Sequence, residues 1–206
     1  MSARDDILSA IRARQLSVPA RPPAYDGPEI PGDLVERFAA RARAAAGDVR
    51  ILDSMADVPA AIADLLRARN MEAKLHIPPG TEALDWDGAP GVTRTTSAPG
   101  PDDAALAIAP HGIAETGTLA FPAAETRPAS WHFRPGFEIA VIRAGDILPR
   151  LENVIAKVKQ AGAFPHTLNL VTGPSRTGDI EQTLELGAHG PKALAVLIVK
   201  DGASSK

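Results

Sequence analysis

The segment 171–181, Val-Thr-Gly-Pro-Ser-Arg-Thr-Gly-Asp-Ile-Glu, combines residue types that suit the binding of an anion. It follows an apolar run and joins a Gly/Pro turn to an acidic stretch with helical spacing, which predicts a strand, a tight loop and the start of a helix. That geometry directs several backbone N–H groups and the positive end of a helix dipole at one point. Arg176 adds a guanidinium that can hold a carboxylate or a phosphate through two hydrogen bonds.

The spacing of Gly173 and Gly178 matches the phosphate-binding loop G-x-x-x-x-G-K-[ST], but the residues that follow do not. Asp179 stands where that loop needs a lysine, and Ile180 stands where it needs a hydroxyl group. We therefore exclude an ordinary nucleoside-triphosphate loop and expect a site for another anion or polar ligand. In the alternative, structural interpretation, the glycines form only a turn and Thr177 caps the helix that follows.

A second polar segment, 112–118, places Glu115, Thr116 and Thr118 on a glycine-flanked turn between two apolar strands. Glu115 could act there as a general base, a nucleophile or a hydrogen-bond acceptor for a ligand. Alternatively, its carboxylate only accepts hydrogen bonds from the backbone of its own turn. A partly buried carboxylate needs a partner, and we expect Arg176 to be that partner. This pairing would bring both loops to one shared pocket.

A third segment, Gly187-Ala-His-Gly-Pro, carries His189 between a predicted helix and the last predicted strand. Near a carboxylate this imidazole could move protons or bind a metal, and equally it could hydrogen-bond the free carbonyl groups at the helix end. The histidines of the chain show no metal-ligand spacing, so we expect no metal site. The segment 131–135, Trp-His-Phe-Arg-Pro, suits a lid, a subunit contact or local packing.

The 206-residue chain has the composition of a folded protein, with 45% hydrophobic and 23% charged residues. A net charge of −3 and only 4% aromatic residues give no reason to expect a nucleic acid as partner. The chain has no cysteine, which excludes disulfides, thiolate catalysis and any thiolate-bound iron–sulfur cluster within it. Because we find neither a signal peptide nor an apolar run of membrane-spanning length, we expect a cytoplasmic protein.

Alternating apolar patterns predict an α/β fold, with a mostly parallel sheet and helices on both of its faces. Ligands of such folds bind at the carboxyl ends of strands. A proline-rich stretch separates a short N-terminal helix from the rest, which divides the chain into residues 1–32 and a domain over 33–206. Asp146 is the expected N-cap of the clearest helix. Helices are predicted over residues 2–15, 33–47, 58–68, 147–160 and 179–186, and strands over residues 49–52, 73–77, 91–96, 104–109, 117–121, 138–142, 167–172 and 193–199.

The runs 109–121, 170–186 and 187–191 resemble, in order and separation, the LUD domain of the lactate utilization protein C family. The resemblance is strongest over residues 104–200. It implies a NagB/RpiA/CoA-transferase-like fold, which is also that of 5-formyltetrahydrofolate cyclo-ligase. It further implies a role in oxidising L-lactate to pyruvate together with two partner proteins of the iron–sulfur type, and the lack of cysteine agrees with clusters that reside in those partners. The stretch 122–137 departs from the family pattern.

The family motif carries over to two groups of candidate site residues. The candidate catalytic residues are Glu115 and His189. The candidate ligand-binding residues are Thr116, Gly117, Thr118, Gly173, Pro174, Ser175, Arg176, Thr177, Asp179 and Glu181. The resemblance identifies no cofactor for this chain.

Three functional hypotheses follow from the residues and the resemblance. In the first, the chain is a subunit of an L-lactate-oxidising complex that binds a small anionic or polar ligand at the strand ends. In the second, it is an independent acyl-transfer or CoA-transfer enzyme that uses Glu115 as its nucleophile. In the third, it is a non-catalytic assembly or regulatory module, with residues 1–32 and 122–137 as contacts. Each hypothesis allows an oligomer.

Overall fold

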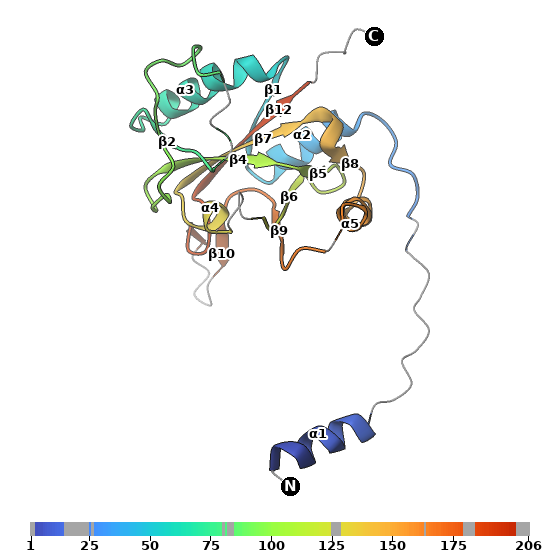
Figure 1. Ribbon diagram of the computed structural model, residues 1–206. Coiled ribbons are helices and arrows are strands. Elements are labelled where there is room, and N and C mark those ends of the chain that lie inside the picture. Colours follow the sequence, from blue (N-terminus) through green and yellow to red (C-terminus); the bar gives the residue numbers. More distant parts are fainter. Residues whose placement is uncertain are drawn as a thin grey trace.

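The computed structural model describes residues 3–14, 25, 27–79, 81, 85–124, 129–162, 164–178 and 184–200. Its centre is a six-stranded, wholly parallel sheet (Figure 1). The predicted α/β class and the predicted parallel sheet are therefore confirmed. In spatial order the strands are β1 (Asp48–Leu52), β12 (Ala193–Val199), β7 (Phe137–Arg143), β4 (Ala104–Ala109), β2 (Lys74–His76) and β3 (Thr93–Thr95).

Each face of this sheet is covered by a helix. Successive side chains of a strand point to opposite faces, so the sheet has an apolar layer on either side for a helix to pack on. Helix α3 (Val58–Ala68) packs through Ile62 and Leu65 on a face that includes Leu106 and Leu197. Helix α2 (Leu34–Ala44) packs on the other face, where alanine side chains such as Ala107 allow it to approach closely. The carboxylate of the N-cap, Asp33, accepts backbone hydrogen bonds at 2.7 and 3.3 Å from the first turn of α2.

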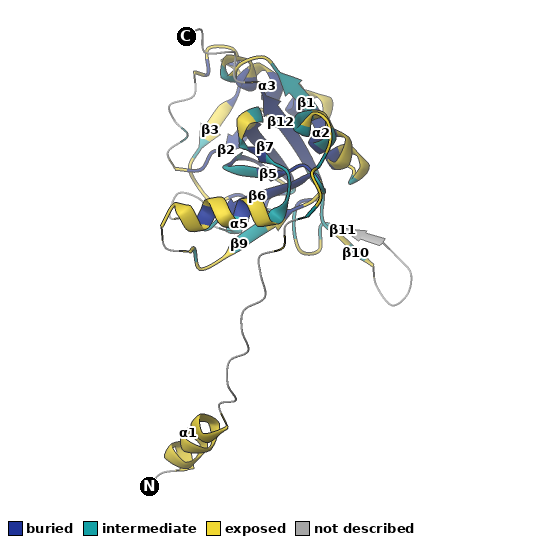
Figure 2. Cartoon of the chain, turned by 90° about the vertical axis from the view of Figure 1, so that its right-hand side faces the viewer, coloured by how far each residue is buried: buried dark blue, intermediate teal, exposed yellow. Residues whose placement is uncertain are grey.

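A second sheet of four strands lies beside the first. The sequence predicted one sheet and did not predict that these strands form a separate one. Its strands, in the order β8 (Ile147–Leu148), β5 (His111–Ile113), β6 (Thr118–Pro122) and β9 (Leu168–Val171), form one parallel and two antiparallel pairs. Helix α5 (Leu151–Gln160) covers it through Val154 and Val158, which pack on Ile113 and Ala120 (Figure 2). The two strands predicted over 117–121 and 167–172 therefore pair with each other, antiparallel, in this smaller sheet.

The predicted helix over 147–160 begins later than expected, and Asp146 is not its N-cap. Residues 147 and 148 pair with β5, and Pro149 disfavours helical geometry in the residue before it. Asp146 instead ends a short 3-10 turn, η2 (Ala144–Asp146), and Arg150 occupies the N-cap position of α5. An N-cap prediction from a single acidic residue failed here because strand pairing competed with the helix.

The predicted helix over 179–186 is also wrong where the structure describes it. Residues Arg176–Gly178 form β10, which pairs antiparallel with β11 (Leu184–Leu186). Thr177 is therefore a strand residue and not a helix cap, while residues 179–183 lie outside the described residues. The remaining short elements are η1 (Met55–Asp57) and α4 (Ser130–Phe133).

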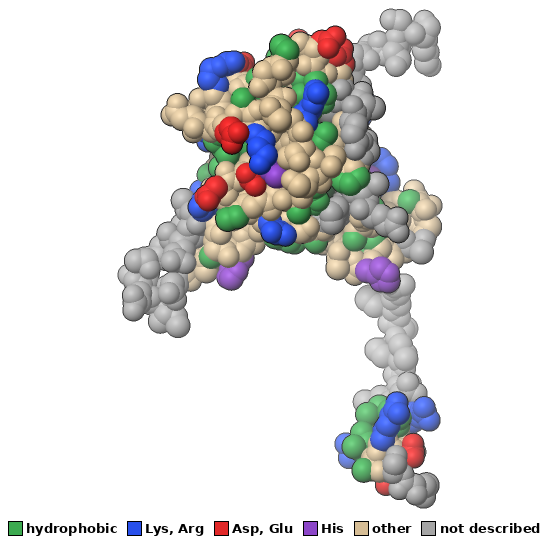
Figure 3. Space-filling model, turned by 60° about the vertical axis from the view of Figure 1, so that its left-hand side comes forward, with side chains coloured by type: hydrophobic (Ala, Val, Ile, Leu, Met, Phe, Trp, Pro, Cys, Tyr) green, Lys and Arg blue, Asp and Glu red, His purple; other side chains and the backbone are tan. Residues whose placement is uncertain are grey.

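The N-terminal helix α1 (Ala3–Ala13) buries none of its residues. Ile7 and Ile11 are each 60% exposed, and hydrophobic and arginine side chains lie side by side on its surface (Figure 3). Nearer the domain, the carbonyl of Pro28 accepts a hydrogen bond from Arg150, so the end of the predicted 1–32 segment contacts the start of α5. No helix in the described part of the chain has the length and hydrophobicity to cross a bilayer.

Two glycine turns pack directly on the last turns of α2. Gly117, in the turn between β5 and β6, has φ +70°, and a Cβ there would lie 2.4 Å from the backbone nitrogen of Ala42. Gly173, in the loop after β9, has φ +72°, and a Cβ there would lie 2.1 Å from the carbonyl oxygen of Ala45. Both positions need glycine for its left-handed backbone and for its lack of a side chain.

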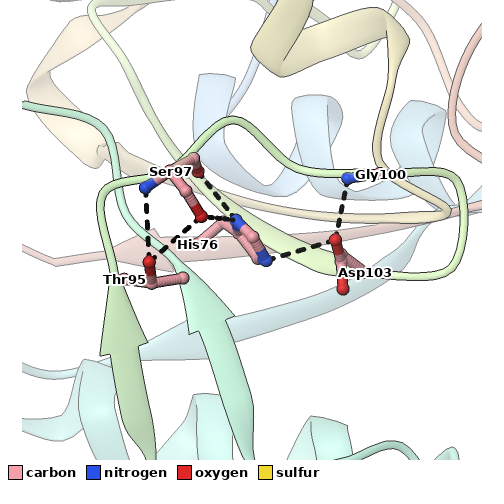
Figure 4. Close-up of polar contacts among 5 residues, drawn as sticks. All are labelled: His76, Thr95, Ser97, Gly100 and Asp103. Atoms are coloured by element: carbon pink, nitrogen blue, oxygen red, sulfur yellow. Dashed lines mark hydrogen bonds and ion pairs between the residues drawn. The ribbon is translucent and has the colours of Figure 1, made fainter.

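A buried histidine joins the ends of β2 and β3 to the start of β4 (Figure 4). The Nδ1–H of His76 donates to the carbonyl oxygen of Ser97 at 2.8 Å, since a carbonyl can only accept. Its Nε2 lies 3.2 Å from Oδ2 of Asp103, within ion-pair distance but outside hydrogen-bond geometry. The Ser–His–Asp composition resembles a hydrolase triad, but Nδ1 is occupied by the Ser97 carbonyl and cannot act as base for the Ser97 hydroxyl. We assign this cluster a structural role.

Replacing Gly117 with alanine is expected to lower the free energy of unfolding by about 2–4 kcal/mol, because the methyl group overlaps α2 and the backbone is left-handed. Gly91→Ala is the matched control, since a Cβ at Gly91 has no neighbour within 4 Å. Urea unfolding followed by circular dichroism measures both variants. Equal unfolding midpoints would mean that α2 moves away from the turn at little cost.

Asp103→Asn is expected to lower the free energy of unfolding at pH 7 by about 1 kcal/mol, through loss of a charge-assisted contact that solvent partly screens. The hydrogen bond from Gly100 lowers the pKa of Asp103 below its ordinary value, the charge of His76 adds to this, and burial opposes it. A lowered carboxyl pKa contributes stability above the unfolded-state value and loses it as pH falls through the folded-state value.

The difference between Asp103→Asn and the wild type should therefore shrink between about pH 5 and pH 2. Asp102→Asn is the control, because the side chain of Asp102 is 93% exposed and its contact with Lys192 is long. Urea unfolding over this pH range tests both variants. A penalty for Asp103→Asn that is the same at pH 7 and pH 2 would contradict the electrostatic explanation.

Candidate functional site

A pocket of about 460 Å³ lies where three segments distant in sequence meet. The loop 172–176 after β9 forms one wall, the turn 189–191 before β12 forms another, and His132 and Phe133 of α4 complete it with Ala45. The predicted site residues that line this pocket are Gly173, Pro174, Ser175, Arg176 and His189. The first and third polar segments of the sequence analysis, 171–181 and 187–191, are thus brought together at this pocket.

The pocket lies beside the amino ends of the large sheet. Residues 45, 133 and 191 each precede a strand of that sheet, namely β1, β7 and β12. From the sequence we predicted that the ligand site lies at the carboxyl ends of parallel strands. That geometry holds here only for β9, which belongs to the small sheet and runs antiparallel to β6.

Glu115 does not line this pocket, and its ion-pair partner is Arg150 and not Arg176. The Nη1 of Arg150 donates to Oε1 of Glu115 at 2.7 Å, and its Nη2 donates to the carbonyl of Pro28. Arg150 in turn lines a separate hollow of about 400 Å³ with residues of the N-terminal segment, among them Tyr25. The Glu115 carboxylate therefore anchors the N-terminal segment through Arg150.

A chain of hydroxyl groups links the Glu115 turn to the pocket. Thr116 and Thr118 exchange a hydrogen bond at 2.7 Å, and Thr118 exchanges another with Thr172 at 2.6 Å. Thr118 is buried, whereas Thr172 lines the pocket. The acidic turn and the arginine loop are thus neighbours, but the expected shared pocket is not formed, because Glu115 pairs with Arg150 and none of the residues 115–118 lines the pocket.

The backbone of the arginine loop is largely engaged in holding the pocket together. The N–H of Ser175 donates to the carbonyl of Pro191 at 2.8 Å, and the N–H of Gly187 donates to the carbonyl of Ser175 at 3.1 Å. Because Arg176 begins a β-hairpin, no helix dipole starts there. Asp179 and Glu181 lie outside the described residues. Attraction for an anion would therefore come from side chains, above all from Arg176.

The pair formed by His132 and Glu138 adjoins the pocket, and the sequence analysis did not single it out. Glu138, on β7, is wholly buried, and His132, on α4, is 2% exposed. Nδ1 of His132 lies 2.8 Å from Oε1 of Glu138. Among the described residues, neither Nε2 of His132 nor Oε2 of Glu138 has a hydrogen-bond partner. Burial raises the pKa of Glu138, and the hydrogen bond with His132 opposes part of that rise.

A signal for Glu138 was present in the sequence. It is the one charged residue in the apolar run Phe137–Ile142, of which residues 138–142 were predicted to be a strand of a sheet covered on both faces. A carboxylate at such a position must find a buried partner. The partner, His132, follows residues whose spacing predicted no particular structure, so the pair itself needed coordinates.

The side chains that line the pocket are polar groups that could hold an anion and donate hydrogen bonds to it. Arg176 and His189 offer cationic or hydrogen-bonding groups, Ser175 and Thr172 offer hydroxyls, and His132 offers a buried imidazole. A search of the described residues finds no group of three or more His, Cys, Asp or Glu side chains that could hold a metal ion.

Comparison with known proteins gives three findings. Residues 102–199 match the model of the LUD domain. The chain is 28% identical over 166 residues to the uncharacterized protein YkgG of Escherichia coli, covering 78% of this chain and 71% of YkgG. It is 32% identical over 129 residues to the lactate utilization protein C of Bacillus licheniformis, covering 59% of this chain and 52% of that protein. The alignment thus spans about half the length of that curated relative.

A solved structure supports the fold. The crystal structure of a DUF162 family protein from Deinococcus radiodurans superimposes with a TM-score of 0.59 at 23% identity, covering 84% of this chain and 99% of that one. At this identity the likeness concerns the fold alone. Residues 102–199 therefore match the LUD domain, and the chain is similar to the proteins named lactate utilization protein C.

Proposed function

We propose that this chain is a cytoplasmic subunit of a system that oxidises L-lactate to pyruvate, and that it binds a small anionic ligand in the 460 Å³ pocket. The pathway is supported by the name of its relatives, lactate utilization protein C. The ligand class is supported by the residues that line the pocket.

The observation that carries the ligand proposal is the position of Arg176 at the rim of a small polar pocket. Arg176 is exposed and lines the pocket together with His189, Ser175 and Thr172. A guanidinium binds a carboxylate through two parallel hydrogen bonds, and hydroxyl groups can accept or donate to the rest of a small molecule. The volume falls within the range of small-molecule sites.

The electron-transfer chemistry of lactate oxidation is assigned to partners in this proposal. The chain has no cysteine and so cannot bind an iron–sulfur cluster through thiolates. We therefore propose iron–sulfur proteins of the same system as its partners. Residues 1–32 are proposed to form a segment separate from the domain over 33–206, with the exposed apolar face of α1 available for such partners.

The ion pair of Glu115 favours an anchoring role over acyl transfer. A carboxylate nucleophile has to face its substrate, whereas Glu115 is held at 2.7 Å by Arg150 and lies outside the lining of the pocket. The proposal accordingly gives Arg176, and not Glu115, the contact with the ligand.

Arg176→Ala is expected to weaken the binding of L-lactate or pyruvate about 10- to 100-fold, because a charge-assisted hydrogen-bond pair is lost. Isothermal titration calorimetry on the purified chain measures this. Arg67→Ala is the matched control, since Arg67 is exposed on α3 and forms an ion pair with Asp64 of the same helix, away from the pocket lining. Equal affinities of the Arg176→Ala variant and the wild type would contradict the proposed ligand contact.

Deleting the gene is expected to abolish growth on L-lactate in a strain without another lactate oxidase. The reason is that the proposed complex cannot function without its subunit. Growth on pyruvate is the control, and the wild-type gene supplied on a plasmid should restore growth on L-lactate. Unimpaired growth of the deletion strain on L-lactate would count against the pathway, whatever the pocket binds.

A further inference from the structure

A carboxylate and an imidazole are buried together behind the wall of the pocket. Glu138 lies in the middle of the large sheet, between Leu194 of β12 and Ala105 of β4. Its surroundings are therefore apolar on both sides, and His132 is the ionisable group that acts on it. A buried charge of this kind is tolerated only when a partner neutralises it.

The number of protons on the pair follows from this burial. A pair without net charge holds two protons, and at 2.8 Å one of them lies between Nδ1 of His132 and Oε1 of Glu138. The second proton then has two possible places, which are Nε2 of His132 and, when Nδ1 holds the shared proton, Oε2 of Glu138. Neither atom has a hydrogen-bond partner among the described residues, so an acceptor placed at Nε2 would favour the arrangement in which the far nitrogen of His132 is a donor.

Two sides of the His132 ring are occupied by neighbouring side chains. The Nδ1 edge of the ring faces Glu138, and one ring face stacks on Phe121 with the ring centroids 3.9 Å apart. His132 lines the pocket, where the other ionisable groups are Arg176 and His189. Nε2 is buried and finds no acceptor among the described residues. An unpaired buried donor carries a free-energy cost, which a ligand acceptor in the pocket would remove.

We propose that His132 is a ligand-contacting residue of this pocket, with Nε2–H donating to an oxygen of a bound carboxylate, and that Glu138 is the residue that positions the ring through Nδ1. This inference rests on the proposed use of the pocket as an anion site. In this proposal the buried Nε2–H of His132 and the exposed guanidinium of Arg176 contact the ligand from different walls of the pocket.

The first test uses the unmodified chain with 15N-labelled histidine. Nitrogen chemical shifts distinguish a protonated from an unprotonated imidazole nitrogen, and Nε2 of His132 is expected to be protonated at pH 7 when pyruvate is bound. Saturating pyruvate is expected to shift this resonance. A bare Nε2 in the pyruvate-bound protein, or a resonance that pyruvate binding leaves unmoved, overturns the proposal.

The second test replaces the positioning residue. In Glu138→Gln the amide nitrogen can donate to Nδ1, which keeps the proton on Nε2, or the amide oxygen can accept from Nδ1–H, which removes it; the nitrogen shifts of the variant distinguish the two cases. In the second case, pyruvate should bind about tenfold more weakly, while Arg176 is intact. His132→Gln should weaken binding to a similar extent. Circular dichroism melting identifies any variant that fails to fold. If both variants fail to fold, the nitrogen chemical shifts of the wild-type chain decide the question.

The outcomes separate this inference from the proposed function. If Arg176→Ala loses affinity while Glu138→Gln and His132→Gln keep it, the anion site stands and the role of His132 fails. If pyruvate and L-lactate do not bind to the wild type, the proposed ligand fails. Acetate, a carboxylate without an oxo group, is then titrated at the same His132 resonance. A shift supports the donor role, and its absence overturns it.

Discussion

The close approach of α2 to two glycine turns is the constraint on which the candidate site depends. Gly117 and Gly173 leave no room for a side chain against the last turns of that helix. Each turn begins or ends a strand of the small sheet, so the helix that covers the large sheet also fixes the small one. The arginine loop, the threonine chain and the pocket wall at Ala45 all follow from this contact.

Much of the fold could be predicted because its strongest signals are local. The uninterrupted apolar runs 104–109 and 193–199 became strands of the parallel sheet at the predicted bounds, and the amphipathic stretch 58–68 became α3. The failures occurred where tertiary pairing outweighed local preference. Residues 147–148 had helical spacing but gained more from pairing with β5, and residues 184–186 pair with β10.

The candidate site was predictable in its parts and not in its assembly. Residue types identified the arginine loop and the His189 turn, and both line the pocket. The partner of Glu115 could not be predicted, because Arg150 and Arg176 carry the same side chain and only the path of the chain decides between them. The pairing of His132 with Glu138 could not be predicted either. The two residues belong to different elements, α4 and β7, and neither residue stands in a motif.

The burial of Glu138 has a consequence for how related sequences can diverge. Losing the histidine alone would leave an uncompensated carboxylate in the centre of the sheet, and losing the glutamate alone would leave a histidine whose ring is free to turn. Each single substitution is therefore expected to destabilise the protein, so positions 132 and 138 should change together in related sequences. Members of the family that lack a histidine at position 132 are then expected to carry an uncharged side chain at position 138.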